Sequence, residues 1–403
     1  MKAVMYGAGN IGRGFIGMLF SASGYEVTFV DVAKPVIEAL NQRGTYPVRM
    51  VSNEGKEDQE VRHVRAVDGN DQEAVAEAIR EADLAATAVG VKALKFVIPN
   101  LAAGIKKRMR KGGAPLNIII CENLMDAHKV VEKMLKAELS DEEIRWFDRN
   151  VGLVEASIGR MVPVQTEEMR DGDPLRVCVE RYGFLPVDQA AFKGEIPKIE
   201  HMVPFEPFDF YIKRKLYVHN MGHAACGYLG LYSHREYIYE SIEDAVIQGM
   251  VQNAMEESCL ALSQKYKVPA EQLVKHMQDL LFRFTNRALK DTCRRVGADP
   301  ERKLARTDRM IGASLLCMEQ GILPVFISVG TAGAVYAYLQ EQGQKQSMEQ
   351  AEMALRTVSG LEEGHPLYGW ILPFYKLYRD GASIWEIRRA AEEMRSRQLT
   401  GII

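Results

Sequence analysis

The sequence has few cysteines, and those it has do not cluster. Only six occur among 403 residues, with no Cys-x-x-Cys pair and no spacing typical of a disulfide framework. We therefore expect reduced thiols and a cytoplasmic protein. The first residues, MKAVMYGAGN, already have the pattern of a strand followed by a glycine turn, which leaves no space for a signal peptide.

An excess of charge of either sign is also missing. The 51 lysines and arginines nearly balance the 54 aspartates and glutamates, and no long basic run occurs. This balance excludes the strong positive field that attracts nucleic acid.

Long apolar runs are equally scarce. One run, over residues 321–339, carries no charge, but it contains a proline and three glycines and lies between polar segments. We expect a buried core helix there and no membrane partner.

Internal repeats and low-complexity tracts are absent, and a hydrophobic content of 47% is enough for large cores. Short apolar runs alternate with amphipathic stretches in the first third, which is typical of a parallel sheet covered on both faces. The expected strands are residues 2–6, 26–30, 84–89 and 117–121, and the expected helices include 35–42 and 71–82. Alternating residues between 151 and 195 predict further strands that extend this sheet, and from residue 211 helical periodicity dominates.

These patterns predict two domains. Residues 1–200 form a doubly wound α/β domain of the Rossmann type with extra strands, which binds a dinucleotide. Residues 201–403 form a mostly α-helical domain that carries the substrate and the catalytic groups.

A glycine-rich turn follows the first strand and opens a helix. It comprises Gly7, Ala8, Gly9, Asn10, Ile11 and Gly12. In a dinucleotide site, the first glycine permits the tight turn, the second lets the backbone approach the pyrophosphate, and the third lets helix and strand pack closely. The free amides of the helix N-terminus then face the phosphates. The alternative is a βα turn that needs glycines for structural reasons alone.

Asp31 ends the second expected strand, 19 residues after the last glycine of this turn. A carboxylate there accepts hydrogen bonds from the adenosine ribose hydroxyls and repels a 2′-phosphate. No arginine cluster follows it, so we expect NAD rather than NADP as the cofactor. Gly90 belongs to a second glycine turn, after the strand 84–89, and we expect this backbone to pass near the cofactor as well.

The segment RKLYVHNMGH places Lys215, Asn220 and His223 at the start of a helical stretch. At 100° per residue the three side chains span a broad arc of one helix face. Oxidation of a secondary alcohol requires a base for the hydroxyl proton and donors for the developing alkoxide. Lys215 can be that base if its pKa falls from about 10.4 toward roughly 7 to 8. Asn220 and Asn123 can donate to the oxygen, and His223 can bind the substrate or orient the lysine.

Each of these residues also has a simpler interpretation. A single lysine is usually a solvated charge, and a single histidine is usually a satisfied helix residue. Cysteines and histidines do not have the spacing of a zinc dehydrogenase site, so we expect no metal. Tyr211 and Lys215 form the Tyr-x-x-x-Lys pattern of short-chain dehydrogenases, but they lie outside the nucleotide domain, and we treat this match as a coincidence.

Several motifs together resemble the polyol-specific long-chain dehydrogenases. They are GAGNIGRG at residues 7–14, TAVG at 87–90, CEN at 121–123 and Lys-x4-Asn-x2-His at 215–223, and the likeness covers nearly the whole chain. The resemblance implies a metal-free, NAD-dependent interconversion of mannitol 1-phosphate and fructose 6-phosphate. It implies Lys215 as the base and Asn123 with Asn220 as the donors to the oxygen. It also implies a monomer or a weak homo-oligomer whose partner is a small sugar alcohol or its phosphate.

Other functions remain open at this point. A relative that acts on an unphosphorylated polyol or on a hexuronate can use the same lysine, and a protein that only senses NAD, or serves as a scaffold, can keep the fold. Between residues 283 and 309 the sequence carries nine basic residues. Any two or three of these can bind a phosphate, so no phosphate ligand is assigned.

Overall fold

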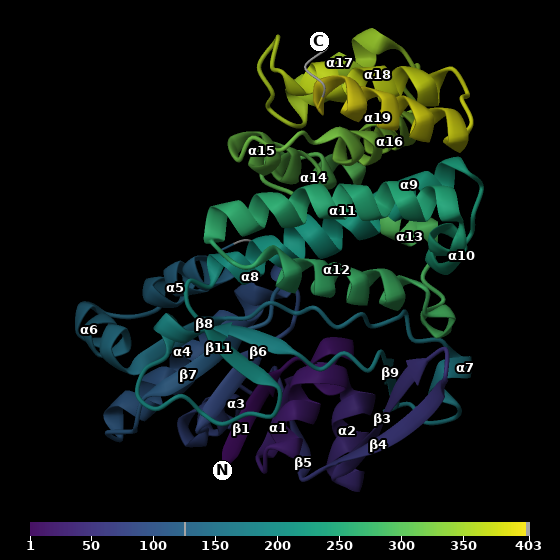
Figure 1. The fold of residues 1–403 in the computed structure, drawn as a ribbon. Helices are drawn as coiled ribbons and strands as arrows, with labels where there is room; N and C mark the ends of the chain where they lie inside the picture. Colours follow the sequence, from purple (N-terminus) through teal and green to yellow (C-terminus); the bar gives the residue numbers. More distant parts are fainter. Residues whose placement is uncertain (125, 400–403) are drawn as a thin grey trace. The chain divides into compact units, whose positions relative to one another are not determined.

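The computed structural model describes residues 1–124 and 126–399, and the chain divides into two compact units, Met1–Asp209 and Phe210–Ile403 (Figure 1). The first is a mixed α/β unit and the second is built from helices. The predicted boundary after residue 200 precedes the strand β11 (Met202–Phe205), which pairs with a strand of the first unit.

A six-stranded, fully parallel sheet forms the centre of the first unit. Its strands lie in the order β5-β2-β1-β6-β7-β8. Their bounds are β1 Lys2–Tyr6, β2 Glu26–Asp31, β5 Val64–Asp68, β6 Leu84–Thr87, β7 Leu116–Ile120 and β8 Val151–Glu155. Alternate residues of β1 enter different cores: Met5 packs into one and Tyr6 into the other. Because both faces of the sheet are covered, its strands are nearly continuous apolar runs. The doubly wound fold predicted from the sequence is confirmed.

Helices cover both faces of this sheet. They are α1 Met18–Ala22, α2 Lys34–Arg43, α3 Gln72–Glu81, α4 Leu94–Arg110, α5 Ala127–Ala137 and α6 Asp141–Asn150, with the short helix α7 Glu167–Arg170 farther along the chain. Local capping explains several of their starts. The Asp71 carboxylate accepts a hydrogen bond from the amide of Ala74 at the start of α3, and Ser140 and Glu143 form a capping box at α6. The short helical segments η1 Gly12–Gly17, which is π-helical and directly follows the glycine turn, η2 Val91–Ala93 and η3 Gln189–Ala191 complete the unit.

The extra strands are only partly as predicted. β8 extends the main sheet, but β9 (Val177–Val179) joins a separate three-stranded sheet with the order β4-β3-β9. β3 (Thr45–Ser52) and β4 (Gly55–Arg62) form an antiparallel hairpin. β10 (Leu185–Asp188) pairs along its length with β11 and meets the end of the main sheet through a single bridge between Val187 and Ala156. The prediction that all strands after residue 151 extend the main sheet is therefore wrong. The hairpin offers β9 another pairing partner, because the edge of β3 that does not face β4 pairs with β9.

The second unit is helical throughout its described part. Its elements are α8 Asp209–Arg214, η4 Lys215–Asn220, α9 Met221–Tyr232, α10 Ile238–Glu243, α11 Ala245–Tyr266, α12 Ala270–Phe284, η5 Arg287–Leu289, α13 Cys293–Gly297, α14 Pro300–Lys303, α15 Ile311–Glu319, α16 Val325–Glu341, α17 Met348–Thr357, α18 Leu367–Arg379 and α19 Ile384–Leu399. Only an isolated bridge, between Tyr237 and Thr292, has strand geometry here.

The uncharged stretch 321–339 forms most of α16, whose residues are largely buried, as predicted. A Cβ added at Gly330 would come within 2.9 Å of the Ala225 side chain of α9, so glycine lets these two helices approach closely. The carboxylate of Glu257, on α11, accepts hydrogen bonds from the Phe326 and Ile327 amides at the start of α16. Among the described residues, no helix combines the length and the apolarity that crossing a bilayer requires.

Candidate active site

The glycine turn between β1 and the first helix is shaped by close contacts. Gly7 has φ +94°, and a Cβ there would lie 2.6 Å from the Ala88 carbonyl oxygen. A Cβ at Gly12 would lie 1.8 Å from the carbonyl oxygen of Gly7, so only glycine lets the helix approach the turn this closely. At Gly9, in contrast, a Cβ would meet nothing within 4 Å. Neighbouring atoms thus leave no room for a side chain at Gly7 or Gly12, whereas the space beside Gly9 is empty.

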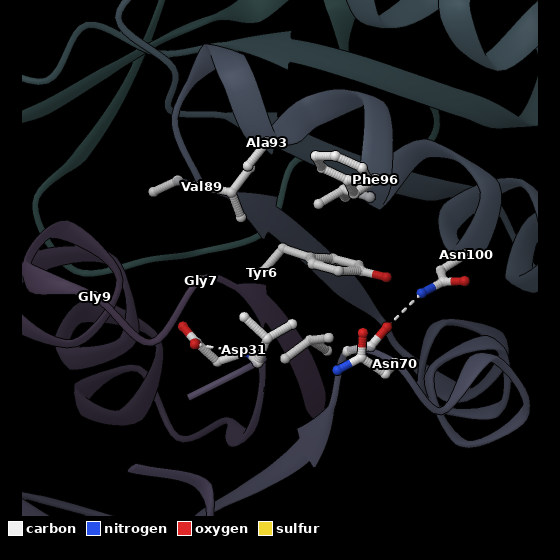
Figure 2. Close-up of a pocket in the computed structure, with 14 residues that line it drawn as sticks. Tyr6, Gly7, Gly9, Asp31, Asn70, Val89, Ala93, Phe96 and Asn100 are labelled. Carbon is white, nitrogen blue, oxygen red and sulfur yellow. Dashed lines mark hydrogen bonds between the residues drawn. The ribbon is translucent and has the colours of Figure 1, made fainter. Parts of the chain in front are cut away.

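Asp31 connects the end of β2 to this turn. One carboxylate oxygen accepts a hydrogen bond from the Ala8 amide at 2.6 Å. The other accepts from the amides of Val32 and Ala33 at 2.8 and 2.9 Å. Asp31 therefore has a structural role that the sequence pattern did not reveal. It also lines a pocket beside the turn (Figure 2).

This pocket has a volume of about 390 Å³, within the range of small-molecule sites. Its walls come from the carboxyl ends of β1, β2, β5 and β6 and from the start of α4, which is where open α/β sheets bind ligands. The lining residues are Tyr6, Gly7, Gly9, Val30, Asp31, Val32, Gly69, Asn70, Ala88, Val89, Ala93, Phe96, Val97 and Asn100. Gly7, Gly9 and Asp31 were predicted from the sequence. Tyr6, Asn70, Phe96 and Asn100 were not.

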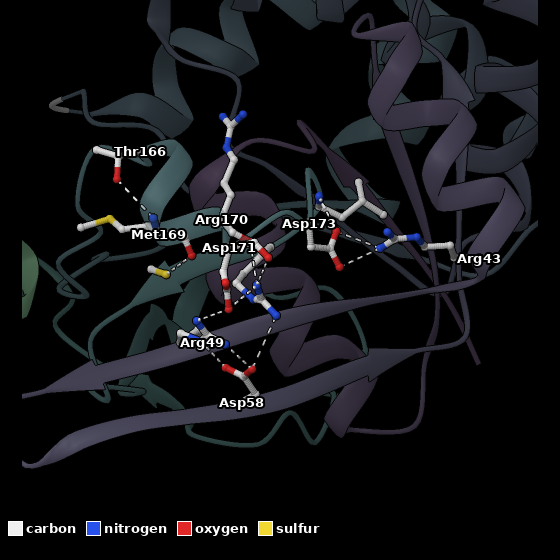
Figure 3. Close-up of polar contacts among 11 residues, drawn as sticks. Arg43, Arg49, Asp58, Thr166, Met169, Arg170, Asp171 and Asp173 are labelled. Atoms are coloured by element: carbon white, nitrogen blue, oxygen red, sulfur yellow. Dashed lines mark hydrogen bonds and ion pairs between the residues drawn. The ribbon is translucent and has the colours of Figure 1, made fainter.

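A second sheet supports the helix that follows the turn. A Cβ at Gly14 would lie 2.7 Å from the Val179 side chain of β9, and the buried guanidinium of Arg13 donates hydrogen bonds to the carbonyl oxygens of Ala8 and Leu175. Ion pairs hold this sheet together (Figure 3). Arg49 binds Asp58 across the hairpin at 2.6 Å and reaches Asp171 at 3.3 Å. The extra sheet therefore packs directly against the helix that follows the glycine turn.

The second glycine turn is held by a buried carboxylate. Glu122 accepts hydrogen bonds from the amides of Val89 and Gly90, at 3.0 and 2.8 Å. Gly90 has φ +86°, a conformation that favours glycine. The next residue, Asn123, is exposed just beyond the end of β7. Sequence reasoning missed Glu122, although it lies beside Asn123 in the CEN motif.

Lys215 and Asn220 are the first and last residues of a π-helical segment, η4, between α8 and α9. The amide of Met221 donates to the carbonyl oxygen of Leu216, five residues earlier, so the turn is wider than an α-helical one. Residues five apart, such as Lys215 and Asn220, then lie one turn apart on the same face. The α-helical count of 100° per residue, used above, is wrong here. π-helical turns occur frequently at functional sites.

His223 lies on α9, one turn beyond Asn220, and has three neighbours in the second unit. Its ring stacks on Phe284, with ring centroids 4.9 Å apart. Its Nε2 lies 3.1 Å from a carboxylate oxygen of Asp291, an ion-pair distance whose geometry falls short of a hydrogen bond. Arg295 pairs with the same carboxylate at 2.7 Å. Although burial opposes it, pairing with His223 and Arg295 lowers the pKa of Asp291 to about 2. A permanent carboxylate favours a proton on Nε2 of His223, which leaves Nδ1 as an acceptor when the ring is neutral.

The surroundings of Lys215 are rich in cations. Burial and then the nearby Arg283 lower the pKa of His219 well below its ordinary value, and Lys215 is among the charges that contribute. Burial, with Arg214 and Arg283, likewise lowers the pKa of His276 to about 2. Both histidines are therefore neutral at physiological pH.

The Asp291 carboxylate provides a first test of this arrangement. If His223 acts in the site as the sequence predicts, Asp291→Asn is expected to lower turnover by about tenfold, because the carboxylate would then act through the orientation of His223 and not on the reacting atoms. Steady-state kinetics of the purified variant measure this. Arg295→Gln is the matched control, since it removes a half-exposed partner of the same carboxylate, and it should change turnover less than about twofold. Equal losses in both variants would contradict the role of Asp291.

The structure thus groups the predicted residues in two sets. In the first unit, the glycine turn, Asp31 and Gly90 surround one pocket or adjoin it, and Asn123 follows β7. In the second unit, Lys215, Asn220 and His223 lie within one helical stretch. Among the described residues, no three His, Cys, Asp or Glu side chains gather as a metal-binding group.

Two family models match the sequence. The mannitol dehydrogenase Rossmann domain matches residues 1–201, and the mannitol dehydrogenase C-terminal domain matches residues 208–362. A mannitol-1-phosphate 5-dehydrogenase of Brevibacillus brevis is 35% identical over 373 residues, which cover 91% of this chain and 95% of that protein. The protein of the same name from Caldanaerobacter subterraneus subsp. tengcongensis is 36% identical over 369 residues, with coverage of 90% and 95%.

Two solved structures share the fold. The mannitol 2-dehydrogenase of Pseudomonas fluorescens, in a ternary complex with NAD and D-mannitol, superposes with a TM-score of 0.76 at 14% identity, covering 97% of this chain and 94% of that one. A D-sorbitol dehydrogenase in substrate-free form gives a TM-score of 0.79 at 16% identity, with coverage of 96% and 94%. At these identities the likeness concerns the fold alone.

Proposed function

The chain belongs to the mannitol dehydrogenase family, and on this basis we propose that it is an NAD-dependent dehydrogenase that interconverts D-mannitol 1-phosphate and D-fructose 6-phosphate. One observation carries the proposal: two relatives with the name mannitol-1-phosphate 5-dehydrogenase are 35% and 36% identical over about nine tenths of the chain. Both family models match in sequence order, so the chain contains both the Rossmann domain and the C-terminal domain of the family.

The first unit fits a dinucleotide. The open backbone at Gly9 leaves space for a pyrophosphate, and the amides at the start of the following helix face it. Asp31 lines the neighbouring pocket, where its free acceptor capacity suits ribose hydroxyls. When bound, NAD supplies the hydride acceptor beside the substrate carbon. The chain's own groups must then bind the sugar alcohol, orient it and move its proton.

Lys215 takes the hydroxyl proton in this mechanism. As the C–H bond gives up its hydride, the O–H proton passes to the neutral amine, and the alkoxide becomes a carbonyl. Asn220 and Asn123 donate amide N–H groups to the oxygen while its negative charge grows. His223, with Nε2 directed at Asp291, presents Nδ1 to a substrate hydroxyl or to the lysine ammonium. Reduction of the ketone runs through the same groups in reverse.

Substrate choice is tested by steady-state turnover of purified protein with mannitol 1-phosphate, mannitol and fructuronate. We expect the highest kcat/KM with mannitol 1-phosphate. Turnover of unphosphorylated mannitol or fructuronate alone would favour the polyol or hexuronate alternatives. NAD binding without turnover of any of the three would favour a sensing or scaffold role.

Cofactor choice depends on Asp31. Asp31→Asn removes the charge that repels a 2′-phosphate but keeps one acceptor for the backbone amides of Ala8, Val32 and Ala33. We expect kcat/KM with NADP to rise by about tenfold and kcat/KM with NAD to fall by a similar factor. Asp31→Ala should give the same shift with a lower Tm, since those amides lose their acceptor. An unchanged ratio of NAD to NADP in both variants would remove Asp31 from this role.

Cellular location and assembly complete the proposal. All six cysteines are free and buried, which suits a reducing compartment, and we propose a cytoplasmic enzyme. We also propose a monomer or a weak homo-oligomer that binds only small molecules. Light scattering of the purified protein over a range of concentrations tests the assembly.

A further inference from the structure

The chain just before Asn123 is held by the buried carboxylate of Glu122. Both residues follow the end of β7, at the carboxyl edge of the parallel sheet. The Glu122 carboxylate binds the amides of Val89 and Gly90 at 3.0 and 2.8 Å, and these two residues follow the neighbouring strand β6. The backbone that precedes Asn123 is therefore attached to the next strand of the sheet.

The chain beyond Asn123 is held by a second carboxylate, that of Glu155. This residue ends β8, which pairs with β7 on its other side. His128 lies in the first turn of α5, five residues after Asn123. Its Nδ1 atom lies 3.1 Å from a carboxylate oxygen of Glu155, and because an ionised carboxylate can only accept, Nδ1 donates. This pair joins the start of α5 to the end of β8.

The surroundings of the pair favour its charged form. The side chains of His128 and Glu155 are 28% and 11% exposed, so solvent screens their attraction only in part. The hydrogen bond to Glu155 raises the pKa of His128 above its ordinary value, although burial opposes this. Asp126 raises this pKa further and Lys129 lowers it. Burial raises the pKa of Asp188, at the end of β10, and the charge of His128 opposes that rise.

Asn123 lies between these two attachments and has none of its own. Within residues 1–124 and 126–399, its exposed side chain has no hydrogen-bond partner. Its place at the sheet edge therefore depends on the backbone on either side of it. A displacement of about 1 Å in a group that binds the reacting atoms can lower the rate by roughly 100-fold.

We propose that His128 and Glu155 are positioning residues for the reaction, because their ion pair holds the backbone beyond Asn123 where the amide can meet the substrate oxygen. The proposal rests on the function proposed above, in which Asn123 donates to that oxygen. In this role neither His128 nor Glu155 touches the substrate. The alternative is a pair that stabilises the end of the sheet and has no effect on the reaction.

Turnover of His128 variants tests the proposal. His128→Ala should lower kcat for mannitol 1-phosphate oxidation by about tenfold and change KM by less than about twofold, since the misplaced amide serves mainly the transition state. His128→Asn should keep kcat within about threefold of the unmodified enzyme, because its side-chain nitrogen can replace Nδ1 as the donor to Glu155. A pair that only stabilises the fold predicts an unchanged kcat in both variants.

Asn117→Ala is the matched control for stability. The Asn117 side chain bonds the backbone of Lys193 at 3.0 and 2.8 Å, at the opposite end of β7. Its loss should lower the Tm, as the loss of His128 does, but kcat should change by less than about twofold. Lys129→Ala controls for charge on α5, because it breaks only an exposed pair with Asp126. It should change neither quantity.

A double variant shows whether His128 acts through Asn123. In the background of Asn123→Ala, His128→Ala should lower kcat by less than about twofold further, because the group that it positions is already gone. Fully multiplicative losses would assign the effect of His128 to another group and overturn the proposal. A normal kcat in Asn123→Ala would overturn both the proposal and the donor role of Asn123.

Hydrogen exchange, followed by mass spectrometry on the full chain without sugar, measures the attachment itself. Peptides that contain Asn123 should exchange at least about fivefold faster in His128→Ala, and at an unchanged rate in Asn117→Ala. Unchanged exchange in His128→Ala would overturn the positioning role and leave the dehydrogenase function standing. A failed turnover assay of the unmodified protein would count against that function, and the exchange rates would still report whether the pair holds this segment.

Discussion

Lys215→Ala should lower kcat for mannitol 1-phosphate oxidation by about 10³- to 10⁴-fold, because the hydroxyl proton then has no positioned acceptor. NAD binding should be retained, since the pocket and the glycine turn belong to the other unit of the chain. Steady-state turnover together with the Kd of NADH separates the two effects. Loss of NADH binding along with turnover would indicate misfolding.

The control for this variant is the neighbouring lysine. Lys213 is two residues earlier on α8 and lies over the Tyr266 ring at 5.9 Å. Lys213→Ala removes the same charge from the same stretch, and kcat should change by less than about threefold. A small primary amine in the buffer should restore part of the activity of Lys215→Ala and none of that of Lys213→Ala. Comparable losses in both variants would point to a general effect of charge.

The pH dependence gives a second readout. A lysine base must be neutral to accept the proton, so kcat for oxidation should rise with pH up to the pKa of Lys215 and then level off. In cationic surroundings we expect this midpoint below the ordinary lysine value of about 10.4. The residual activity of Lys215→Ala should not show the same rise. A flat profile of the unmodified enzyme between pH 6 and 10, with hydride transfer limiting the rate, would exclude Lys215 as the base.

Local sequence was sufficient for much of the first unit. The sequence predicted β1, the glycine turn and Asp31. This was possible because a strand that is followed at once by a tight turn and a helix requires particular residue types at fixed positions. The hairpin β3–β4 and the separate sheet that it forms with β9 were not predicted. The pairing of β9 with β3 joins segments far apart in the chain, and the alternation of apolar residues does not show which sheet a strand joins.

In the second unit, the sequence identified the reactive residue types but not their arrangement. The hydrogen bond from Met221 to Leu216 widens one turn, and this determines that Lys215 and Asn220 share a face. A periodic count cannot find such a turn, because it assumes a constant rotation per residue. The sequence around Asp291 contains no motif that marks it, because its partner His223 lies far away in the chain. Tyr6 was counted only as an apolar strand residue, although it lines the pocket.

The second large effect is expected at the asparagines. Asn220→Ala should lower kcat by about 10²- to 10³-fold with a much smaller change in KM, because the amide donates to an oxygen whose charge grows only in the transition state. Asn123→Ala should have an effect of similar size, since the proposed mechanism assigns the other donor to Asn123. Steady-state kinetics of both variants measure this, and their Tm values exclude a loss of folding.

Asn220→Asp distinguishes donation from packing. The carboxylate has the size of the amide, but it cannot donate when ionised and it repels the alkoxide, so its kcat should fall at least as far as that of Asn220→Ala. A loss due to packing alone predicts the opposite order, because Asp preserves the shape. The double variant Asn123→Ala with Asn220→Ala should lose less than the product of the single losses, since the proposed mechanism assigns both amides to one oxygen. Fully multiplicative losses would mean that the two asparagines act on different atoms.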